Sequence, residues 1–209
     1  MLTELTVKDF LNKVAGSDPV PGGGSIAALN GALASALAAM VAHLTIGKKK
    51  YADVQDLMQA IAQETEGLMA DFIADVDRDS EAYDRVFACF KMPKETDEEK
   101  AARSAAIQEA TKYAAEVPLE VARRAYALMP RIAEVARRGN QNAVTDACVA
   151  MLSARNAVLA ALLNVRINLS SLKDQELVAR LQAEADELER QAIAHEQELL
   201  QQINQELRV

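Results

Sequence analysis

The run of residues 26–46 contains no charged side chain, and this constrains the fold more than any other feature of the sequence. A helix of this length could cross a bilayer, but the run is mostly alanine and no aromatic belt flanks it. Four polar residues also interrupt it: Asn30, Ser35, His43 and Thr45. We therefore expect a helix buried on all sides within a protein. Small residues recur on one of its faces at every fourth position, which should let a neighbouring helix approach closely: Ala27, Gly31, Ser35 and Ala39.

The rest of the chain predicts further helices. A second, nearly apolar helix is expected from Asn142 to about Ser171, and amphipathic helices over residues 6–16, 53–90 and 173–209. Another begins at Thr96, which with Glu99 forms a capping box, and should meet a boundary at Pro118 and a kink or break at Pro130. Alanine makes up about a fifth of the residues, well above ordinary usage. The sequence thus predicts an all-α fold, an Ala-rich multi-helix bundle with two central buried helices, as a single domain over residues 1–209.

Charge and cysteine content limit the partners and the compartment. The net charge is −8, from 23 Lys and Arg against 31 Asp and Glu, which argues against nucleic-acid binding through a basic face. The N-terminal segment MLTELTVKDF has an early glutamate and lacks the apolar region of a signal peptide. Cys89 and Cys148 are isolated and form no CxxC motif. We expect a cytoplasmic protein that binds neither nucleic acid nor membrane.

One carboxylate falls in the middle of the apolar face of residues 53–90. At about 100° per residue, Phe72, Val86 and Phe90 all lie within about 20° of Asp79 on the helical wheel. Burial raises the pKa of an unpaired carboxyl, which is how a catalytic or ligand-binding acid is made. The alternative is that Asp79 pairs with a Lys or Arg of a neighbouring helix or lies where the face reaches solvent. For Asp75, about 40° away on the same wheel, we favour such a structural role.

The expected helix after Asn142 carries a polar stripe on one side of its wheel. Small residues separate its members, which are Asp146, Ser153, Asn164 and Asn168. Small spacers leave room beside the polar groups, and asparagine offers both hydrogen-bond donors and acceptors. The stripe therefore suits a flat, hydrogen-bonding ligand in a groove between helices. The alternative is a set of interhelical hydrogen bonds that fix packing.

Residues 17–25, SDPVPGGGS, are the only strongly non-helical stretch in the first half of the chain. The glycines at 22–24 would expose backbone N–H groups just before a helix, with Ser25 as its N-cap. Such a segment is as often a tight turn as an anion-binding loop, and no GK[ST] follows to make it a P-loop. The lysines at 48–50 could attract an anionic ligand or form a solvated helix end, and on their own they favour the latter.

No metal site is predicted. The two histidines, His43 and His195, are far apart and in no ligand spacing. We expect His43 to be a hydrogen-bonded core residue rather than a base. Neither cysteine has a histidine nearby in the sequence, so a thiol nucleophile is not expected.

Three blocks of sequence together resemble the cyclodeaminase/cyclohydrolase family of folate enzymes. They are DPVPGGGSIAALNGALASALAAMVAHLTIGKKKY at 18–51, DSEAYDRVFACFKMPK at 79–94, and GNQNAVTDA with NVRIN at 139–147 and 164–168. The family contains formimidoyltetrahydrofolate cyclodeaminase, alone or within a bifunctional protein, and a methenyltetrahydrofolate cyclohydrolase. The resemblance covers nearly the whole chain except the last helix, and PGGGS with GKKKY at this spacing is fairly specific.

The resemblance implies an all-α homodimer that binds a tetrahydrofolate derivative as substrate, in a groove near the dimer interface, with no metal or other cofactor. The catalytic residues that it implies are Asp79 and Asp146. The motif positions that it carries over for substrate binding are Pro21, Gly22, Gly23, Gly24, Ser25, Lys48, Lys49, Tyr51, Asn140, Asn164 and Asn168. One Asp would move protons while the other orients the pterin. The asparagines would hold the pterin, and the Gly-rich turn with the lysines would hold the glutamate carboxylates or a polyglutamate tail.

We expect first a cyclodeaminase that converts 5-formimidoyltetrahydrofolate to 5,10-methenyltetrahydrofolate and ammonia, as in histidine degradation, with a formiminotransferase as its partner. Methenyltetrahydrofolate cyclohydrolase is the alternative, because hydrolysis by water needs similar groups. A non-catalytic folate- or anion-binding helical protein is a further alternative from another class. So is a structural bundle whose polar stripe only sets packing.

Overall fold

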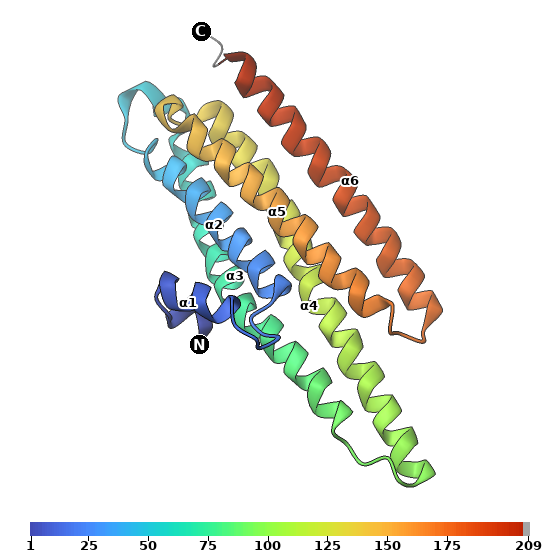
Figure 1. Ribbon diagram of the computed structural model, residues 1–209. Helices are drawn as coiled ribbons and strands as arrows, with labels where there is room; N and C mark the ends of the chain where they lie inside the picture. Colours follow the sequence, from blue (N-terminus) through green and yellow to red (C-terminus); the bar gives the residue numbers. More distant parts are fainter. Residues whose placement is uncertain (207–209) are drawn as a thin grey trace.

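The computed structural model describes residues 1–206, and every regular element in that part of the chain is helical (Figure 1). Its α-helices are α1 (Val7–Val14), α2 (Gly23–His43), α3 (Gln55–Phe90), α4 (Asp97–Arg138), α5 (Val144–Leu169) and α6 (Gln175–Glu206). The short 3-10 helices η1 (Leu2–Glu4), η2 (Lys49–Val54) and η3 (Gln141–Ala143) precede α1, α3 and α5. The all-α prediction is confirmed.

The two apolar helices, α2 and α5, lie side by side in one layer, with α3 and α4 behind them (Figure 1). Helix α6 runs along the outer side of α5 and also packs on α4, while α1 lies beside the lower half of α2 and the middle of α3. The core lies between the layers and includes Phe72 of α3, Leu128 of α4 and Leu162 of α5, all fully buried. This arrangement places both ends of α2 and α5 next to the helix connections.

The small-residue face of α2 packs as predicted. All four of its members are buried: Ala27, Gly31, Ser35 and Ala39. Gly31 marks one close approach, since a Cβ atom there would lie 2.7 Å from the Phe72 ring of α3. A side chain at this position would therefore push the two helices apart.

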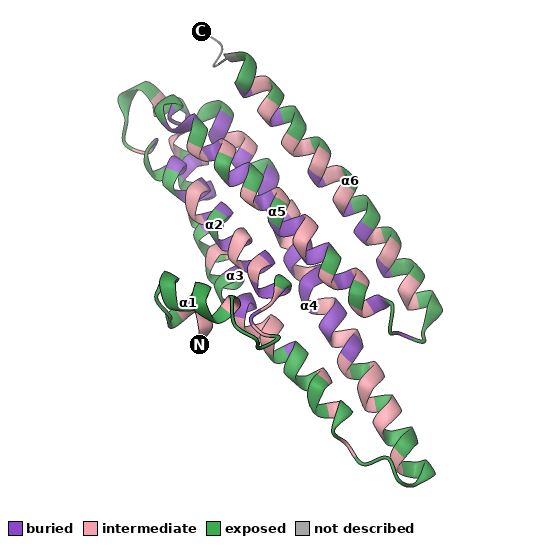
Figure 2. Cartoon of the chain, in the orientation of Figure 1, coloured by how far each residue is buried: buried purple, intermediate pink, exposed green. Residues whose placement is uncertain are grey.

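Neither apolar helix is covered on all sides within a single chain, so the expectation that residues 26–46 are buried on all sides is wrong for one chain alone. Leu33 on α2 is 51% exposed, and Leu163 and Ile167 on α5 are 65% and 67% exposed. Figure 2 shows exposed and half-buried positions along both helices. By length and composition, α2 and the run 141–169 could each cross a membrane, although 61% of the apolar window in α2 is buried inside the molecule. A uniformly apolar helix gives no sequence signal for the face that stays open.

Helix α4 continues through both of its prolines, so the boundary expected at Pro118 and the break expected at Pro130 are wrong. Pro118 has no N–H to bond the Ala114 carbonyl four residues earlier. The Asn168 side chain of α5 donates to that carbonyl instead, at 2.9 Å. A neighbouring helix thus supplies the hydrogen bond that proline removes. The capping box of Thr96 and Glu99 at the start of α4 is confirmed.

Two local predictions at the ends of α2 are also wrong. The helix begins at Gly23 with Gly22 as its N-cap, so Ser25 lies inside the first turn, where it is fully buried. At the other end, His43 is not a core residue: its side chain is about half exposed, and its Nε2 lies 2.8 Å from Glu66 Oε1. The helix begins earlier than expected, which places Ser25 inside it. His43 lies on an open side of the last turn of α2.

Candidate functional site

A cavity of about 340 Å³ opens where the start of α2 meets α3, α4 and the end of α5. Its lining contains six of the predicted site residues: Gly22, Gly23, Gly24, Asp79, Asn164 and Asn168. The remaining lining is largely apolar, and a concave apolar surface with a few convergent polar groups is the usual form of a small-molecule site. Within residues 1–206, no cluster of His, Cys, Asp and Glu is arranged to hold a metal ion.

Asp79 supplies the carboxyl group in the lining of this cavity. The Ser25 hydroxyl lies 3.3 Å from Asp79 Oδ2 and 2.8 Å from the Val76 carbonyl oxygen. Burial raises the pKa of the Asp79 carboxyl, and hydrogen bonding by the Ser25 side chain and backbone offsets this only in part. Within residues 1–206, Asp79 forms no ion pair with a lysine or arginine. The geometry therefore favours a half-buried, unpaired acid over the ion-pair alternative.

Asp75, one helical turn before Asp79 on α3, is a structural acid. It is 3% exposed, it accepts a hydrogen bond from Arg124, and its Oδ1 lies 3.1 Å from Arg78 Nε. Desolvation raises the pKa of Asp75, while the two arginines lower it. The predicted ion pair is confirmed. The negative charge of Asp75 in turn helps to raise the pKa of Asp79.

The glycines of the PGGGS segment let α2 begin directly against the polar groups of the cavity. A Cβ atom on Gly24 would overlap the Asp79 carboxylate, and one on Gly23 would lie 3.2 Å from Asn164 Nδ2. The first turn of a helix also leaves backbone N–H groups without intrahelical partners, and its dipole favours a nearby negative charge. Close approach is therefore the role that the structure gives to these two glycines.

The two asparagines of α5 are held through their amide nitrogens. Asn164 Nδ2 donates to the Ala160 carbonyl at 2.8 Å, and Asn168 Nδ2 donates to the carbonyls of Ala114 and Asn164 at 2.9 Å. In the described part of the chain, no hydrogen bond reaches either Oδ1 atom. Two amide oxygens in the cavity lining thus remain for the N–H donors of a ligand.

The bond from Asn168 to Ala114 also predicts an effect on stability. Asn168→Ala should lower the free energy of unfolding by about 1–3 kcal/mol, because the buried carbonyl loses its partner. In a Pro118→Ala background the backbone N–H of residue 118 can bond that carbonyl, so the same substitution should cost measurably less. Urea unfolding of the wild type, both single variants and the double variant gives the coupling energy. Equal costs in both backgrounds would show that Asn168 does not act through this carbonyl.

Other predicted site residues lie at the opposite end of α2 and α5. The Asn140 backbone N–H donates to Thr45 Oγ1 at 2.8 Å, and its side chain donates to the Leu44 carbonyl at 3.2 Å. The Tyr51 hydroxyl accepts a hydrogen bond from the Gln141 N–H at 3.1 Å, and this bond lowers the pKa of Tyr51. Asn140 and Tyr51 therefore join the connection between α4 and α5 to the connection between α2 and α3.

Asp146 and the lysines are separated from the Asp79 cavity within one chain. Asp146 lies in the first turn of α5, about 27 Å along the helix axis from Asn164 at about 1.5 Å per residue. Lys48 and Lys49 open the 3-10 helix η2 at that same end. The structure thus forms two groups of predicted residues, and Asp79 and Asp146 do not share a cavity in a single chain. Pro21 is buried and lies outside the lining.

Aromatic residues beside the cavity were missed by the sequence reasoning. Tyr83 lines it and stacks on Phe87 with ring centroids 6.3 Å apart. A signal for them exists: the chain has only 4 Tyr and 4 Phe, yet Tyr83, Phe87 and Phe90 fall within three turns of α3 and are all exposed. Exposed aromatic rings next to a cavity are suited to stacking on a flat ligand.

Comparisons with known proteins give consistent matches. A family model described as formiminotransferase-cyclodeaminase matches residues 6–187. A methenyltetrahydrofolate cyclohydrolase from Methylorubrum extorquens is 44% identical over 170 residues, which cover 81% of this chain and 82% of that protein. A formimidoyltransferase-cyclodeaminase from Rattus norvegicus is 33% identical over 173 residues, which cover 83% of this chain but only 32% of the longer protein. The crystal structure of a formiminotetrahydrofolate cyclodeaminase from Thermotoga maritima matches with a TM-score of 0.83 at 29% identity, covering 97% of this chain and 99% of that one.

Proposed function

The chain belongs to the formiminotransferase-cyclodeaminase family of folate enzymes, and from that premise we propose that it hydrolyses 5,10-methenyltetrahydrofolate to 10-formyltetrahydrofolate. The support is the 44% identity to a cyclohydrolase of similar length, against 33% and 29% identity to the rat and Thermotoga proteins. The sequence alone placed cyclodeamination first, and we place it second on the strength of these identities. Cyclodeamination is the second candidate, supported by the match over nearly the whole Thermotoga cyclodeaminase.

The observation that carries the mechanism is the half-buried carboxyl of Asp79, which pairs with no lysine or arginine among residues 1–206. In the proposed reaction, water adds to the methenyl carbon between N5 and N10 of the folate. Asp79 accepts a proton from this water and returns one to N5 as the bond between that carbon and N5 breaks. The formyl group stays on N10, one proton of the water ends on N5, and the other leaves to solvent. The negative carboxylate also stabilises the positive charge of the methenyl group before attack.

The asparagines and the glycine turn would orient the substrate. The Oδ1 atoms of Asn164 and Asn168 can accept from the amino group and ring N–H of the pterin. Gly23 and Gly24 leave space where other residues would carry a side chain. The pterin could therefore lie against the first turn of α2, next to Asp79. Orientation of this kind lowers the entropy cost of reaching the transition state.

A turnover assay with both substrates tests the proposal. With the methenyl substrate, the expected result is loss of the methenyl absorbance faster than the uncatalysed rate. With the formimidoyl substrate, no ammonia release is expected. Ammonia release from the formimidoyl substrate with slower methenyl hydrolysis would replace the proposal with cyclodeamination. Folate binding by calorimetry without turnover of either substrate would leave only a binding protein. No binding at all would leave a structural bundle.

We further infer a homodimer formed through the open apolar faces of α2 and α5. These adjoining helices expose six large apolar side chains: Leu33, Met40, Val149, Leu152, Leu163 and Ile167. Apolar surface in one continuous patch usually marks an interface. A two-fold contact of this surface with itself would cover both copies at once.

Such a dimer would also complete the site. A two-fold axis perpendicular to α2 and α5 makes the two copies antiparallel, so the Asp146 end of one copy meets the Asp79 end of the other. Lys48, Lys49 and Asp146 of the second copy would then join the cavity, with the lysines facing the carboxylates of the first glutamate of the folate. Two complete sites would result, each built from both chains.

Complementation between two inactive variants tests this composite site. Asp79→Asn and Asp146→Asn should each be inactive as homodimers. Random reassociation of equal amounts after mixing should restore about a quarter of the wild-type activity, since half of the dimers would be mixed and would carry one intact site each. Size-exclusion chromatography with light scattering confirms that dimers form. A mixture that stays inactive while mixed dimers are demonstrated would contradict the composite site.

The remaining expectations follow the same proposal. Hydrolysis needs water and no bound cofactor, so we propose none. The cysteines Cys89 and Cys148 are free, in keeping with a reducing cytoplasm. A formiminotransferase partner belongs only to the cyclodeamination candidate, and the longer relatives carry both activities in their names.

A further inference from the structure

Ser25 is fully buried and does not line the Asp79 cavity, so it lies out of reach of a substrate there. Its hydroxyl lies among three oxygen atoms instead. They are the Val76 carbonyl oxygen at 2.8 Å, Asp79 Oδ2 at 3.3 Å and Ser80 Oγ at 3.2 Å. A serine hydroxyl carries one proton, so it can donate to only one of these oxygens at a time and can accept from another. Rotation of the Ser25 hydroxyl therefore decides which neighbour receives its proton.

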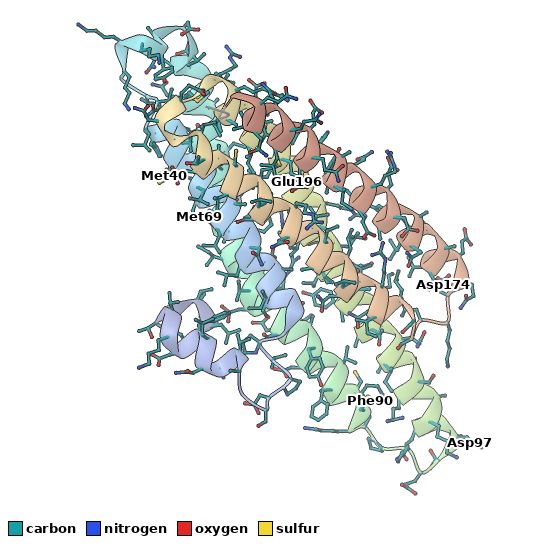
Figure 3. The ribbon with its side chains drawn as sticks, turned by 45° about the horizontal axis from the view of Figure 1, so that its top comes forward. Met40, Met69, Phe90, Asp97, Asp174 and Glu196 are labelled. Carbon is teal, nitrogen blue, oxygen red and sulfur yellow. The ribbon has the colours of Figure 1, made fainter. Side chains whose placement is uncertain are left out.

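Ser80 lines a different concave region from Asp79. This region has a volume of about 470 Å³ and lies between α3 and the segment that joins α1 to α2. We call it the acidic pocket, since its lining contains one cation, Lys13, and four acids: Asp18, Asp77, Glu81 and Asp84. In Figure 3 the stretch of α3 that carries Ser80 lies between the labelled Met69 and Phe90, beside the segment from α1 to α2. Asp79 and Ser80 thus line separate regions, although they are neighbours in the sequence.

The Ser25 hydroxyl connects the Asp79 cavity to the acidic pocket. Residues 19–20 and Tyr83 line both regions and so form a wall between them. The Ser25 hydroxyl is within hydrogen-bonding distance of one residue from each region, Asp79 and Ser80. A continuous line of three side-chain oxygens therefore leads from the carboxyl group in the cavity to the acidic pocket.

The proposed hydrolysis releases one proton that has to reach solvent. The attacking water brings two protons, and one of them ends on N5 of the folate. Asp79 is the acceptor for the second, but a substrate in the cavity would cover the side of this carboxyl that faces it. The second proton therefore needs a route that avoids the cavity. The acidic pocket favours its arrival, because the carboxylates there create a negative potential.

We propose that Ser25 and Ser80 carry this proton from Asp79 to the acidic pocket. The proposal rests on the proposed function, because it takes the reaction to occur at Asp79. Asp79 Oδ2 passes its proton to Ser25 Oγ, the Ser25 hydroxyl passes its own proton to Ser80 Oγ, and the Ser80 hydroxyl passes its proton to water. At each serine one O–H bond forms and one breaks, so both keep one proton and Asp79 returns to the carboxylate. Both serines act through Asp79 and are positioning residues.

Two variants of Ser80 with nearly the same shape test the relay. Ser80→Thr keeps a hydroxyl, whereas Ser80→Val has a methyl group in its place, which also fills the space that a water molecule would need. The valine variant should have a kcat about tenfold below that of the threonine variant, a smaller loss than that of a positioned acid or base. KM should be the same in both, and the solvent deuterium isotope effect on kcat should be larger in the valine variant. Equal kcat values would overturn the relay.

The same pair of substitutions at Ser171 provides the matched control. Ser171 is exposed in the connection between α5 and α6. Ser171→Thr and Ser171→Val should therefore have the same kcat and the same isotope effect. Circular dichroism and urea unfolding of all four variants show whether a loss of kcat at position 80 comes from the fold instead.

Neutron diffraction separates the relay from the proposed function, because it shows hydroxyl hydrogens that X-ray structures at ordinary resolution do not. Crystals in heavy water would be measured on both sides of the Asp79 titration, which infrared spectroscopy locates by comparison with Asp79→Asn. The Ser25 deuterium should point to Asp79 Oδ2 when the carboxyl is ionised, and to Val76 or Ser80 when it is protonated. If this rotation occurs in a protein that turns over neither substrate, the relay stands and the proposed reaction fails. A deuterium that stays on the Val76 carbonyl in both states would overturn the relay, even in an active enzyme.

Discussion

Asp79→Asn is expected to lower kcat by about 10²- to 10⁴-fold, the usual contribution of a positioned acid or base. Asparagine keeps the shape of the side chain and can still accept a hydrogen bond from Ser25, but it cannot take or give a proton. The loss should therefore appear in kcat, while substrate binding changes less. Steady-state kinetics on the methenyl substrate, with circular dichroism to confirm the fold, measure both.

The same variant should change the pH dependence of stability. Burial raises the pKa of Asp79 above its ordinary value of 3.8, so the folded state favours the protonated carboxyl. At acid pH the protonated Asp79 makes its full favourable contribution to the free energy of unfolding. This contribution is lost as the pH rises through the raised pKa. Asparagine carries no such cost, so Asp79→Asn should gain stability relative to the wild type between about pH 4 and about pH 8. Urea unfolding at both ends of that range measures the difference.

Asp71→Asn provides the matched control, because Asp71 is an exposed carboxylate on the same helix. It should leave kcat unchanged. Wild-type turnover in the Asp79→Asn protein would remove Asp79 from the chemistry. Its carboxylate would then have a structural role at the start of α2.

The sequence pattern located Asp79 and Asp75 because both depend on short-range periodicity. A helical wheel needs only the helix and its apolar face, and α3 supplies both without a break over residues 55–90. The structural role of Asp75 followed from the same wheel. Such predictions succeed where one element carries the whole signal.

Two predictions about where a helix begins or ends failed because a second helix decides them. Pro118 was expected to end a helix, but the bond that replaces its missing N–H comes from Asn168, which is 50 positions away in the sequence on α5. Ser25 was expected as an N-cap, but its hydroxyl donates to the Val76 carbonyl of α3, and the N-cap is Gly22, three residues earlier. Patterns of neighbouring residues along the sequence do not predict contacts of this kind.

The separation of Asp79 from Asp146 has the same origin. Each lies on a polar position of an otherwise apolar face, so the two appear equivalent on a wheel. The antiparallel arrangement of α2 and α5 decides which end of α5 meets the glycine turn, and this selects Asn164 rather than Asp146. A family resemblance identifies residues that belong to the same motifs. It does not say whether those residues lie close together within one chain.

Gly24→Ala is expected to lower kcat by about 10²-fold, although it adds a single methyl group. The new Cβ would overlap the Asp79 carboxylate, and the backbone of a packed helix cannot retreat. The Asp79 side chain is the part that can move, and a displacement of about 1 Å at a reacting group costs about 10²-fold in rate. Overpacking should also lower the free energy of unfolding by about 1–3 kcal/mol.

Gly67→Ala is the matched control for this change. Gly67 lies in α3, and no atom lies within 4 Å of the position that its Cβ would take. Alanine should there stabilise the helix by about 0.5–1 kcal/mol and leave kcat unchanged. Crystal structures of both variants would show whether the Asp79 carboxylate has moved. Full activity in Gly24→Ala with a displaced carboxylate would mean that the position of Asp79 does not limit the reaction, whereas full activity with an unmoved carboxylate would mean that α2 itself yields.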